Sequence, residues 1–289
     1  MGAAALVPDR STALKITIAH SPDSDDAFMF YGLAHGKLET DGLEVSHVLR
    51  DIETLNQEAQ RGTYEVTALS FHAYPYVADR YALMPCGGSI GDGYGPLLVA
   101  RDSLAPAEVA SRVVAVPGTL TSATLALKLF APEVRTRVVP FDLILEEVQT
   151  GRADVGLIIH EGQLTFGGFG LSRVLDLGAW WKEQTGLPLP LGGNAVRRDL
   201  GSETMVRLTR LVRETVRYSL AHRQEALSHA LSFARGMEAG VADRFVGMWV
   251  NQLTLDCGEL GRKAVQHFLD RGHDAGVIPR RVVAEFVEA

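Results

Sequence analysis

Short β-rich runs alternate with helix-like segments along the first part of the chain, and this alternation restricts the fold to the α/β class. Leu14–Ala19, Leu43–Leu49 and Val66–Phe71 have the composition of strands. Helical segments separate them, one from Ala27 to Gly36 and one that begins at Asp51 or Thr54 and ends at Gly62. We therefore predict a parallel sheet with helices on both of its faces.

A second set of strands and helices follows the glycine-rich stretch Gly87–Gly95. The almost continuously apolar run Ala153–Ile159 is typical of a strand that is buried on both faces of a sheet. The other expected elements of this set are the strands Leu97–Ala100, Val113–Val116 and Arg137–Val139 and the helices Thr121–Phe130 and Leu143–Thr150. A second sheet is therefore expected between about residue 100 and residue 190.

The chain then returns through Leu187–Pro190 to a strand at Gly193–Val196 and continues as helices. The first of these is predicted to be one long amphipathic helix from its N-cap, Ser202, to about Ala234. The expected later helices are Val241–Val250, Gly258–Gly272 and a short one after Pro279.

This order of elements predicts two lobes with a ligand cleft between them. Lobe one would comprise residues 14–99 and 194–289, and lobe two would comprise residues 100–193. The two crossings between the lobes are expected near Leu97–Arg101 and Gly193–Arg197. Residues 1–13 are predicted to be a disordered leader.

Composition excludes several classes of function. The formal net charge of the 289 residues is −7 and no Lys/Arg-rich stripe occurs, which argues against nucleic-acid binding. No apolar run is long enough for a signal peptide or a membrane span. Cys86 and Cys257 lack the spacing of metal ligands, so we expect no metal site and two reduced thiols. A cytoplasmic protein is the resulting prediction.

The segment Ala68-Leu69-Ser70 ends the third predicted strand. Ligands of open α/β sheets bind beyond the carboxyl ends of strands, so the Ser70 hydroxyl is a candidate donor to a ligand oxygen. A hydroxyl at this place could equally cap the helix that follows. The residues alone leave both interpretations open.

A second candidate is the turn from Val116 to Ala123, which contains Pro117-Gly118 and the hydroxyls of Thr121 and Ser122. Free N–H groups at the start of a helix, together with the helix dipole, favour a carboxylate or phosphate. The spacing is not that of a Walker loop. Plain N-capping of the helix is the alternative.

A third candidate is the pair His160-Glu161, which closes the apolar strand. A neutral imidazole at this end of the sheet could act as a general base, with Glu161 orienting it. A structural or solvated histidine is the alternative.

The acidic segment Ser21–Asp26 could bind a cation, but it lacks the spacing of a calcium loop, and helix capping is the favoured interpretation. Trp180-Trp181 and Phe166–Phe169 could form the wall of an aromatic ligand site. Packing in the core is the favoured interpretation for each of these aromatic segments.

Taken together, these segments resemble the futalosine-pathway enzymes of menaquinone biosynthesis, and among them the 1,4-dihydroxy-6-naphthoate synthase family. The resemblance extends from residue 14 to about residue 280. Its most specific part is Ile158–Thr165. The other matching segments are Ser21-Pro22 with Asp26–Phe28, Thr67–Ser70, Pro117–Ala123 and Leu187–Gly192.

The resemblance implies a two-lobe, periplasmic-binding-protein-like (type II) fold that works as an enzyme without a metal or an organic cofactor. It implies a lyase that converts cyclic dehypoxanthine futalosine, a small anionic aromatic substrate, to 1,4-dihydroxy-6-naphthoate. His160 matches the proposed general base. The implied substrate-binding residues are Ala68, Leu69, Ser70, Ser122 and Ala123, to which we add Thr121, Glu161 and Ser21 as candidates. A homodimer is compatible with this assignment.

Two departures mark a distinct branch. The turn Ser21–Asp26 stands where better-known members have cysteine, proline and asparagine, and Ser122 replaces the second threonine of a Thr-Thr-Ala pattern. Two alternatives stay open. A chorismate dehydratase of the same pathway would share the fold, although the His-Glu-Gly strand end argues against it. A solute-binding protein for a small carboxylate is the other, against which the lack of a signal peptide counts.

Overall fold

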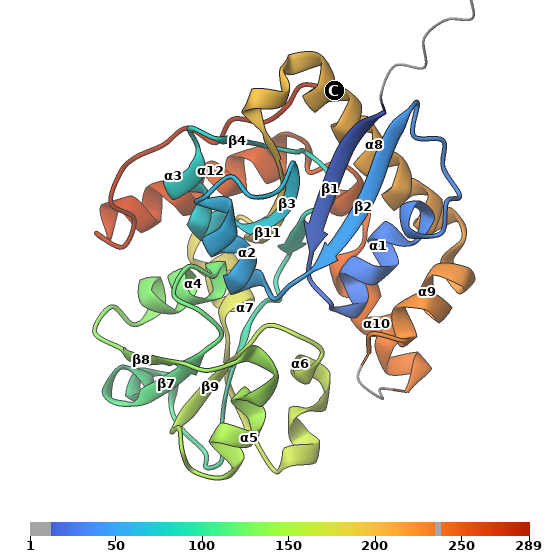
Figure 1. The fold of residues 1–289 in the computed structure, drawn as a ribbon. Helices are drawn as coiled ribbons and strands as arrows, with labels where there is room; N and C mark the ends of the chain where they lie inside the picture. The colour runs from blue at the N-terminus through green and yellow to red at the C-terminus, as the bar shows by residue number, and fades with distance from the viewer. Residues whose placement is uncertain (1–12, 235–237) are drawn as a thin grey trace, which may run out of the picture.

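The computed structural model describes residues 13–234 and 238–289, so the predicted leader lies, except for Ala13, outside the described residues. These residues form two β-sheets that lie side by side, each flanked by helices (Figure 1). The α/β class predicted from the alternation of elements is therefore confirmed.

The first sheet has the strand order β2-β1-β3-β11-β4, and β5 pairs with β11. Its strands are β1 (Leu14–His20), β2 (Leu43–Leu49), β3 (Val66–Ser70), β4 (Tyr81–Leu83), β5 (Ser89–Gly91) and β11 (Leu189–Arg197). The first three strands are parallel, as predicted, with Leu14 opposite Leu43. Strand β11 runs antiparallel to β3, β4 and β5 and so occupies an interior position.

The second sheet has the strand order β10-β6-β9-β7-β8. Its strands are β6 (Leu97–Ala100), β7 (Val113–Val116), β8 (Arg135–Val138), β9 (Val155–Ile158) and β10 (Ser172–Asp176). Strand β9 lies in the middle of the sheet and is buried along its whole length, as its apolar sequence predicted. Strands β7, β8 and β9 are parallel, whereas β6 is antiparallel to β9 and β10.

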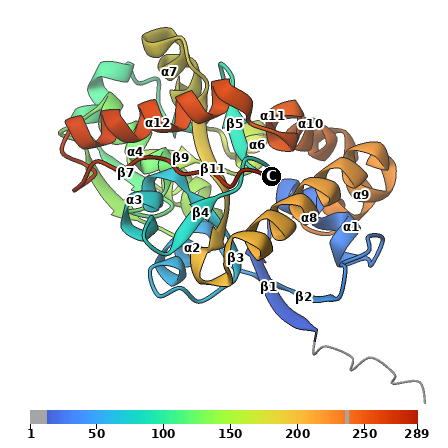
Figure 2. The same cartoon turned by 90° about the horizontal axis from the view of Figure 1, so that it is seen from above.

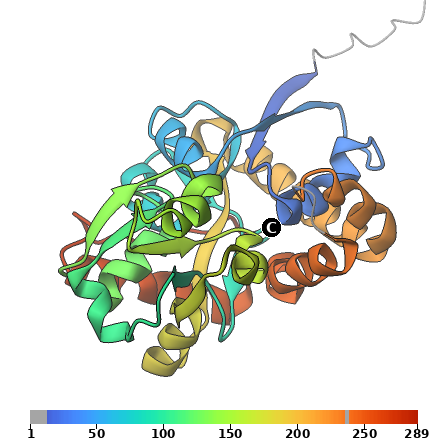
Figure 3. The same ribbon diagram turned by 90° about the horizontal axis from the view of Figure 1, so that it is seen from below.

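Helices cover the faces of both sheets. Those in the first half of the chain are α1 (Ser24–Ala34), α2 (Ile52–Ala59), α3 (Tyr74–Val77), α4 (Ser122–Phe130), α5 (Ile144–Gln149) and α6 (Gly162–Thr165). The rest are α7 (Leu177–Thr185), α8 (Ser202–Ala221), α9 (Arg223–Leu231), α10 (Ala239–Trp249), α11 (Gln252–Leu255) and α12 (Gly258–Asp274). Helices α8, α9 and α10 gather around α1, on the side away from the second sheet (Figures 2 and 3).

Three expectations about where helices begin and end are wrong. The predicted long helix from Ser202 is two helices, because the backbone leaves the helical region at His222 and α9 then turns to pack on α1. Gly201, not Ser202, occupies the N-cap position of α8. Helix α1 begins at Ser24, inside the expected polar turn. Asp25 and Asp26 therefore belong to the first turn of the helix.

The segment after Pro279 is extended and not helical. The N–H of Leu83 donates to the carbonyl of Glu285, and the N–H of Val287 donates to the carbonyl of Leu83. Strand β4 is the edge of the first sheet, and its free N–H and C=O groups need partners. The C-terminal tail supplies them and covers this edge.

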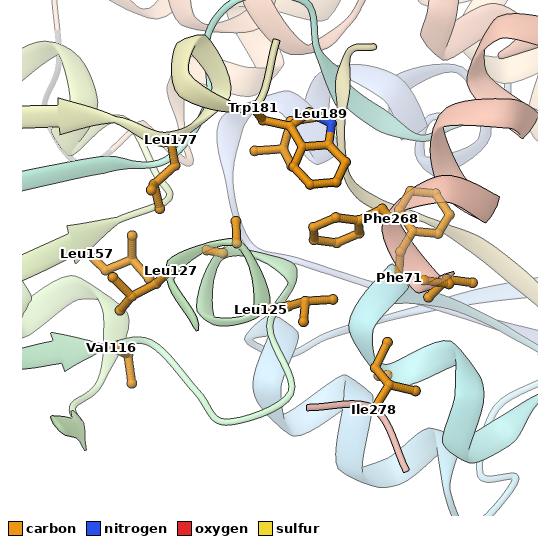
Figure 4. Packing of buried hydrophobic residues seen from close by; sticks show 14 of the residues in the cluster. Phe71, Val116, Leu125, Leu127, Leu157, Leu177, Trp181, Leu189, Phe268 and Ile278 are labelled. Carbon is orange, nitrogen blue, oxygen red and sulfur yellow. The ribbon is translucent and has the colours of Figure 1, made fainter. Parts of the chain in front are cut away.

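One of the three apolar clusters among the described residues spans both sheets. Helix α4 follows β7 of the second sheet, yet its side chains reach elements that pack on the first sheet. Figure 4 shows Leu125 of α4 facing Phe71 and Ile278, while Leu127 faces Leu157 of β9. We call this continuous cluster the apolar seam; Phe71, Leu125, Leu127, Trp181, Leu189, Phe268 and Ile278 belong to it.

The boundaries between the lobes stay a proposal. The divisions expected at 99/100 and 193/194 fall inside β6 and β11, whereas β6 lies wholly in the second sheet and β11 wholly in the first. We therefore propose that the crossings lie at residues 92–96, between β5 and β6, and close to the start of β11.

The apolar seam should carry a large part of the stability. Phe268 is fully buried and its ring meets that of Trp181 edge to face, with 5.3 Å between centroids. Phe268→Ala is expected to lower the free energy of unfolding by about 3–5 kcal/mol, measured by urea unfolding. Leu260→Ala, on the same helix but 46% exposed, is the control and should change it by less than about 0.5 kcal/mol. Equal effects of the two variants would contradict the role of the seam.

Candidate active site

A cavity of about 120 Å³ lies where the two sheets face one another. It is lined by Ser21, Asp23, Asp25, Asp26, Ile52, Ala68, Leu69, Ser70, Gly87, Ser89, Thr121, Ser122, Ala123, Ile159, Leu191, Gly192, Gly193 and Trp249. Seven of the predicted site residues are among them, and they come from both sheets. The other two, His160 and Glu161, do not line it, although the preceding Ile159 does.

Ser70 ends β3 and its hydroxyl is held by a neighbouring side chain. The Asn56 amide donates to Ser70 Oγ over 3.1 Å, and the N–H of Ser70 donates to Asn56 Oδ1 over 2.9 Å. Ser70 makes no capping bond to the helical turn that follows, so helix capping is not the role of this hydroxyl. Because Oγ accepts from Asn56, its own hydrogen is available to a ligand in the cavity.

In the turn that leads into α4, some polar groups stabilise the helix and others are available to bind a ligand. Thr121 caps the helix, because its Oγ1 accepts from the N–H of Thr124 over 3.3 Å. Ser122 Oγ accepts the main-chain N–H of His72 over 3.2 Å and still has a hydrogen to donate. Among the described residues, no acceptor bonds the N–H groups of Ser122 and Ala123. These two N–H groups and the Ser122 hydroxyl form an anion-binding end to the helix.

Part of the predicted anion site is already filled by the protein. The carboxylate of Glu53, from α2, accepts a hydrogen bond from the N–H of Leu120 over 3.0 Å and another from Thr119 Oγ1 over 3.1 Å. A ligand anion is therefore limited to the first turn of α4. The sequence indicated the anion-binding turn but not this internal carboxylate.

Three carboxyl groups line the cavity at the start of α1. Ser21 donates through its N–H to Asp26 Oδ2 over 2.7 Å and through its hydroxyl to Asp23 Oδ2 over 2.6 Å. Burial raises the pKa of Asp26 to about 7, opposed by the Ser21 hydrogen bond and reinforced by Asp23. Burial, together with the charges of Asp26 and Asp23, raises the pKa of Asp25 well above its usual value. The cavity therefore contains a carboxyl group that can donate a proton near neutral pH.

The favoured interpretation of this acidic segment as helix capping missed that role. Asp23 occupies the N-cap position of α1, yet its side chain makes no capping bond. Asp25 and Asp26 are half-buried, and they line a cavity that itself lies deep between the sheets. The available signal was the position of three acids directly after β1, at the same edge of the sheet as Ser70.

His160 follows β9 and is buried, and both of its ring nitrogens bond the backbone. Nδ1 accepts from the N–H of Gly162 over 3.0 Å, so Nε2 carries the hydrogen and donates to the carbonyl of Phe141 over 3.0 Å. Glu161 Oε2 lies 3.8 Å from Nδ1, too far for a hydrogen bond. Nδ1 is therefore occupied as an acceptor, and the hydrogen bond from Gly162 must break before Nδ1 can act as a base.

Trp249 of α10 is the aromatic side chain of the cavity lining, and sequence analysis missed it. Its ring contacts Tyr94 edge to face, with 5.3 Å between centroids. Trp181, considered as a ligand wall, is instead fully buried in the apolar seam, and Trp180 packs against Phe130. Phe166–Phe169 form a short 3-10 helix outside the cavity lining.

Within residues 13–234 and 238–289, no group of three or more His, Cys, Asp or Glu side chains could hold a metal ion. In the same part of the chain, none of the helices has the length and apolar character needed to span a membrane. Cys86 and Cys257 are buried free thiols, and burial raises their pKa values to about 12 and about 11. The absence of a cofactor stays a prediction.

Comparisons with known proteins agree on one family. The family described as "Menaquinone biosynthesis" matches residues 16–274. A 1,4-dihydroxy-6-naphthoate synthase of Thermus thermophilus is 42% identical over 262 residues, which cover 91% of this chain and 95% of the relative. One of the same name from Streptomyces coelicolor is 37% identical over 271 residues, with the same coverage of 91% and 95%.

Solved structures agree on the fold. A protein of Archaeoglobus fulgidus has a TM-score of 0.88 and 44% identity, over 91% of this chain and 98% of that one. The alkanesulfonate-binding protein of Xanthomonas axonopodis pv. citri has a TM-score of 0.70 at 11% identity, over 95% and 97% of the two chains. Such likeness to solute-binding proteins shows the fold alone, and it confirms the predicted two-lobe, type II periplasmic-binding-protein-like architecture.

The acidic group at the start of α1 generates a prediction about pH. The pKa of Asp26 is about 7 in the folded protein and about 4 in an unfolded chain. Between these values the folded state binds more protons, so the free energy of unfolding should decrease as the pH rises from about 4 to 7. Asp26→Asn can still accept the Ser21 N–H but cannot ionise, so it should make this decrease smaller; the raised pKa of Asp25 leaves part of the decrease in place.

Urea unfolding at several pH values between 4 and 8 checks this expectation. Asp142→Asn, which changes an exposed aspartate outside the cavity lining, should leave the pH dependence unchanged. If Asp26→Asn and the unmodified protein follow the same pH profile, Asp26 does not titrate as described.

Proposed function

Because the chain belongs to the menaquinone-biosynthesis family and is an enzyme of the 1,4-dihydroxy-6-naphthoate synthase type, we propose that it converts cyclic dehypoxanthine futalosine to 1,4-dihydroxy-6-naphthoate. The reaction would be a carbon–carbon cleavage. The single observation that carries the proposal is the cavity between the sheets, in which an anion-binding helix end faces a group of carboxyl side chains.

The anion-binding end would hold the carboxylate of the substrate. The free N–H groups of Ser122 and Ala123 and the hydroxyls of Ser122 and Ser70 supply donors, and the dipole of α4 favours negative charge there. Apolar side chains of the lining, Leu69, Ile159 and Leu191, together with Trp249, would contact the ring. This division suits a ligand with an acid group on an aromatic ring.

The cleavage needs a base and an acceptor for electrons. In a retro-aldol reaction the base removes a hydroxyl proton, a carbonyl forms at that carbon, and the electrons of the broken bond pass to the neighbouring carbon. Aromatisation of the naphthoate ring would supply driving force. We propose His160 as the base, supported by the family resemblance and by the place of Ile159 in the cavity wall.

This role asks for a local change of geometry. The ring of His160 must release the N–H of Gly162 or turn toward the cavity before Nδ1 can accept a proton. Catalytic hydrogen bonds often reach their working geometry only when substrate binds, which makes a substrate-induced turn compatible with the buried arrangement.

The Ser122 hydroxyl tests anion binding. Ser122→Ala removes a donor to the proposed carboxylate, so the KM for cyclic dehypoxanthine futalosine should rise roughly 10- to 100-fold. Steady-state kinetics measures this change. Ser111→Ala, an exposed serine outside the cavity, is the matched control and should leave KM unchanged. An unchanged KM in Ser122→Ala would show that this hydroxyl does not contact the substrate.

His160→Asn tests the base. The variant keeps a polar side chain but loses the basic nitrogen, so kcat per folded molecule should fall about 10²- to 10⁴-fold. Losing one backbone hydrogen bond should cost about 0.5–1.5 kcal/mol of stability, so rates are measured well below the melting temperature.

The control is His222→Asn, which changes an exposed histidine and should keep the full rate. A folded His160→Asn that turns over normally would contradict the base role while leaving the lyase proposal intact. If the unmodified protein does not produce naphthoate, the lyase proposal is wrong. Chorismate would then test the dehydratase alternative, and ligand binding without turnover would indicate a solute-binding protein.

We also propose that the protein works in the cytoplasm and that it can form a homodimer. Both suggestions rest on the sequence, through the thiols of Cys86 and Cys257 and the family resemblance. Sedimentation velocity at micromolar concentration would distinguish a dimer of two 31.3 kDa chains from a monomer.

A further inference from the structure

The turn between β7 and α4 is held by a side chain from α2, a helix that packs on the first sheet. Glu53 lies in the first turn of α2, beside the first sheet, and is buried, with 8% of its surface exposed. Its Oε1 accepts from Thr119 Oγ1 over 3.1 Å and its Oε2 accepts from the N–H of Leu120 over 3.0 Å. Hydrogen bonds to a carboxylate are stronger than neutral ones, and burial removes competing water.

The backbone of the turn is shaped to admit this carboxylate. A Cβ atom added at Gly118 would overlap the Glu53 side chain, from Cγ to Oε2. Glycine at this position is therefore required by the close approach of Glu53. The absence of a side chain at Gly118 thus allows the contact between this turn and α2.

His72 makes a second contact with the same turn. Its main-chain N–H donates to Ser122 Oγ over 3.2 Å, and its ring Nδ1 lies 3.2 Å from the carbonyl oxygen of Thr121. Burial lowers the pKa of His72 to about 4, so the ring is neutral near pH 7 and Nδ1 donates its hydrogen to that carbonyl. Glu53 therefore bonds the first half of the turn, and His72 bonds the second half.

We propose that Glu53 is a positioning residue that fixes the Thr119–Ser122 turn against the first sheet, so that the N–H groups of Ser122 and Ala123 face the cavity. Glu53 does not line the cavity and would not touch the substrate. It acts by holding the donors of Ser122 and Ala123 at a set distance from the Ser70 hydroxyl, the donor from the first sheet. The role in catalysis rests on the proposed function; the role in holding the turn does not.

Amide hydrogen exchange without any ligand tests the positioning itself. Glu53→Ala removes both hydrogen bonds, so the amide of Leu120, which loses its acceptor, and the amide of Thr124, which Thr121 caps, should exchange at least tenfold faster than in the unmodified protein. Protection of β9, in the middle of the second sheet, should be unchanged. Glu53→Gln can still accept the N–H of Leu120 through its amide oxygen and should restore most of the protection. Glu44→Ala, an exposed acid on β2, is the charge-matched control.

Kinetics with cyclic dehypoxanthine futalosine tests the consequence. Glu53→Ala should raise KM roughly 10- to 100-fold, as expected for loosened donors, and should change kcat much less. Glu53→Gln should lie close to the unmodified protein. A side chain that only stabilised the fold would lower the melting temperature without this separation of KM from kcat.

A double-mutant cycle checks that the two residues act on one another. Gly118→Ala alone should displace the Glu53 carboxylate and raise KM like Glu53→Ala. In the Glu53→Ala background, the added methyl group meets free space, so Gly118→Ala should cost little more. Additive effects would overturn the proposed contact.

The outcomes separate the two proposals. Faster exchange at the amides of Leu120 and Thr124 in Glu53→Ala, with no naphthoate formed by the unmodified protein, would support the positioning role and reject the proposed function. Naphthoate formation, with exchange and KM unchanged in Glu53→Ala, would reject the positioning role and support the proposed function.

Discussion

Helix α4 packs on two sheets at once, and the rest of the molecule depends on this packing. Leu127 faces β9 in the second sheet, while Leu125 meets Phe71 and Ile278, which pack with the first. An apolar helix can face in two directions only if it is buried almost all round, and α4 is apolar enough for this. The first turn of the helix is thereby fixed relative to both sheets, and that turn presents Ser122 and Ala123 to the cavity.

The cavity has two ends of different electrostatic character. At one end the positive end of the α4 dipole and its free N–H groups favour an anion. At the other end Asp25 and Asp26 stand in the first turn of α1, where burial outweighs the favourable dipole and raises the pKa of both carboxyl groups. The α4 end is therefore suited to binding an anion, and the α1 end is suited to exchanging protons.

Sequence patterns predicted those parts of the structure that follow from local chemistry. The apolar run that forms β9 and the polar end of β3 at Ser70 are such parts. The Thr121 cap was only the alternative to its predicted role as a ligand donor. The break at His222 and the extended tail could not be predicted, because α1 and the edge of β4 decide them from far away. Glu53 and Trp249 were missed for the same reason.

The place of β11 has a consequence for how the chain is made. This strand lies between β3 and β4, yet it comes after the whole second sheet in the sequence. The five strands of the second sheet occupy one continuous stretch, so that sheet can close on itself as the chain leaves the ribosome. The first sheet must wait with a gap between β3 and β4 until β11 arrives, at the entropic cost of joining distant segments. The half of the molecule that begins the protein is thus the half that is finished last.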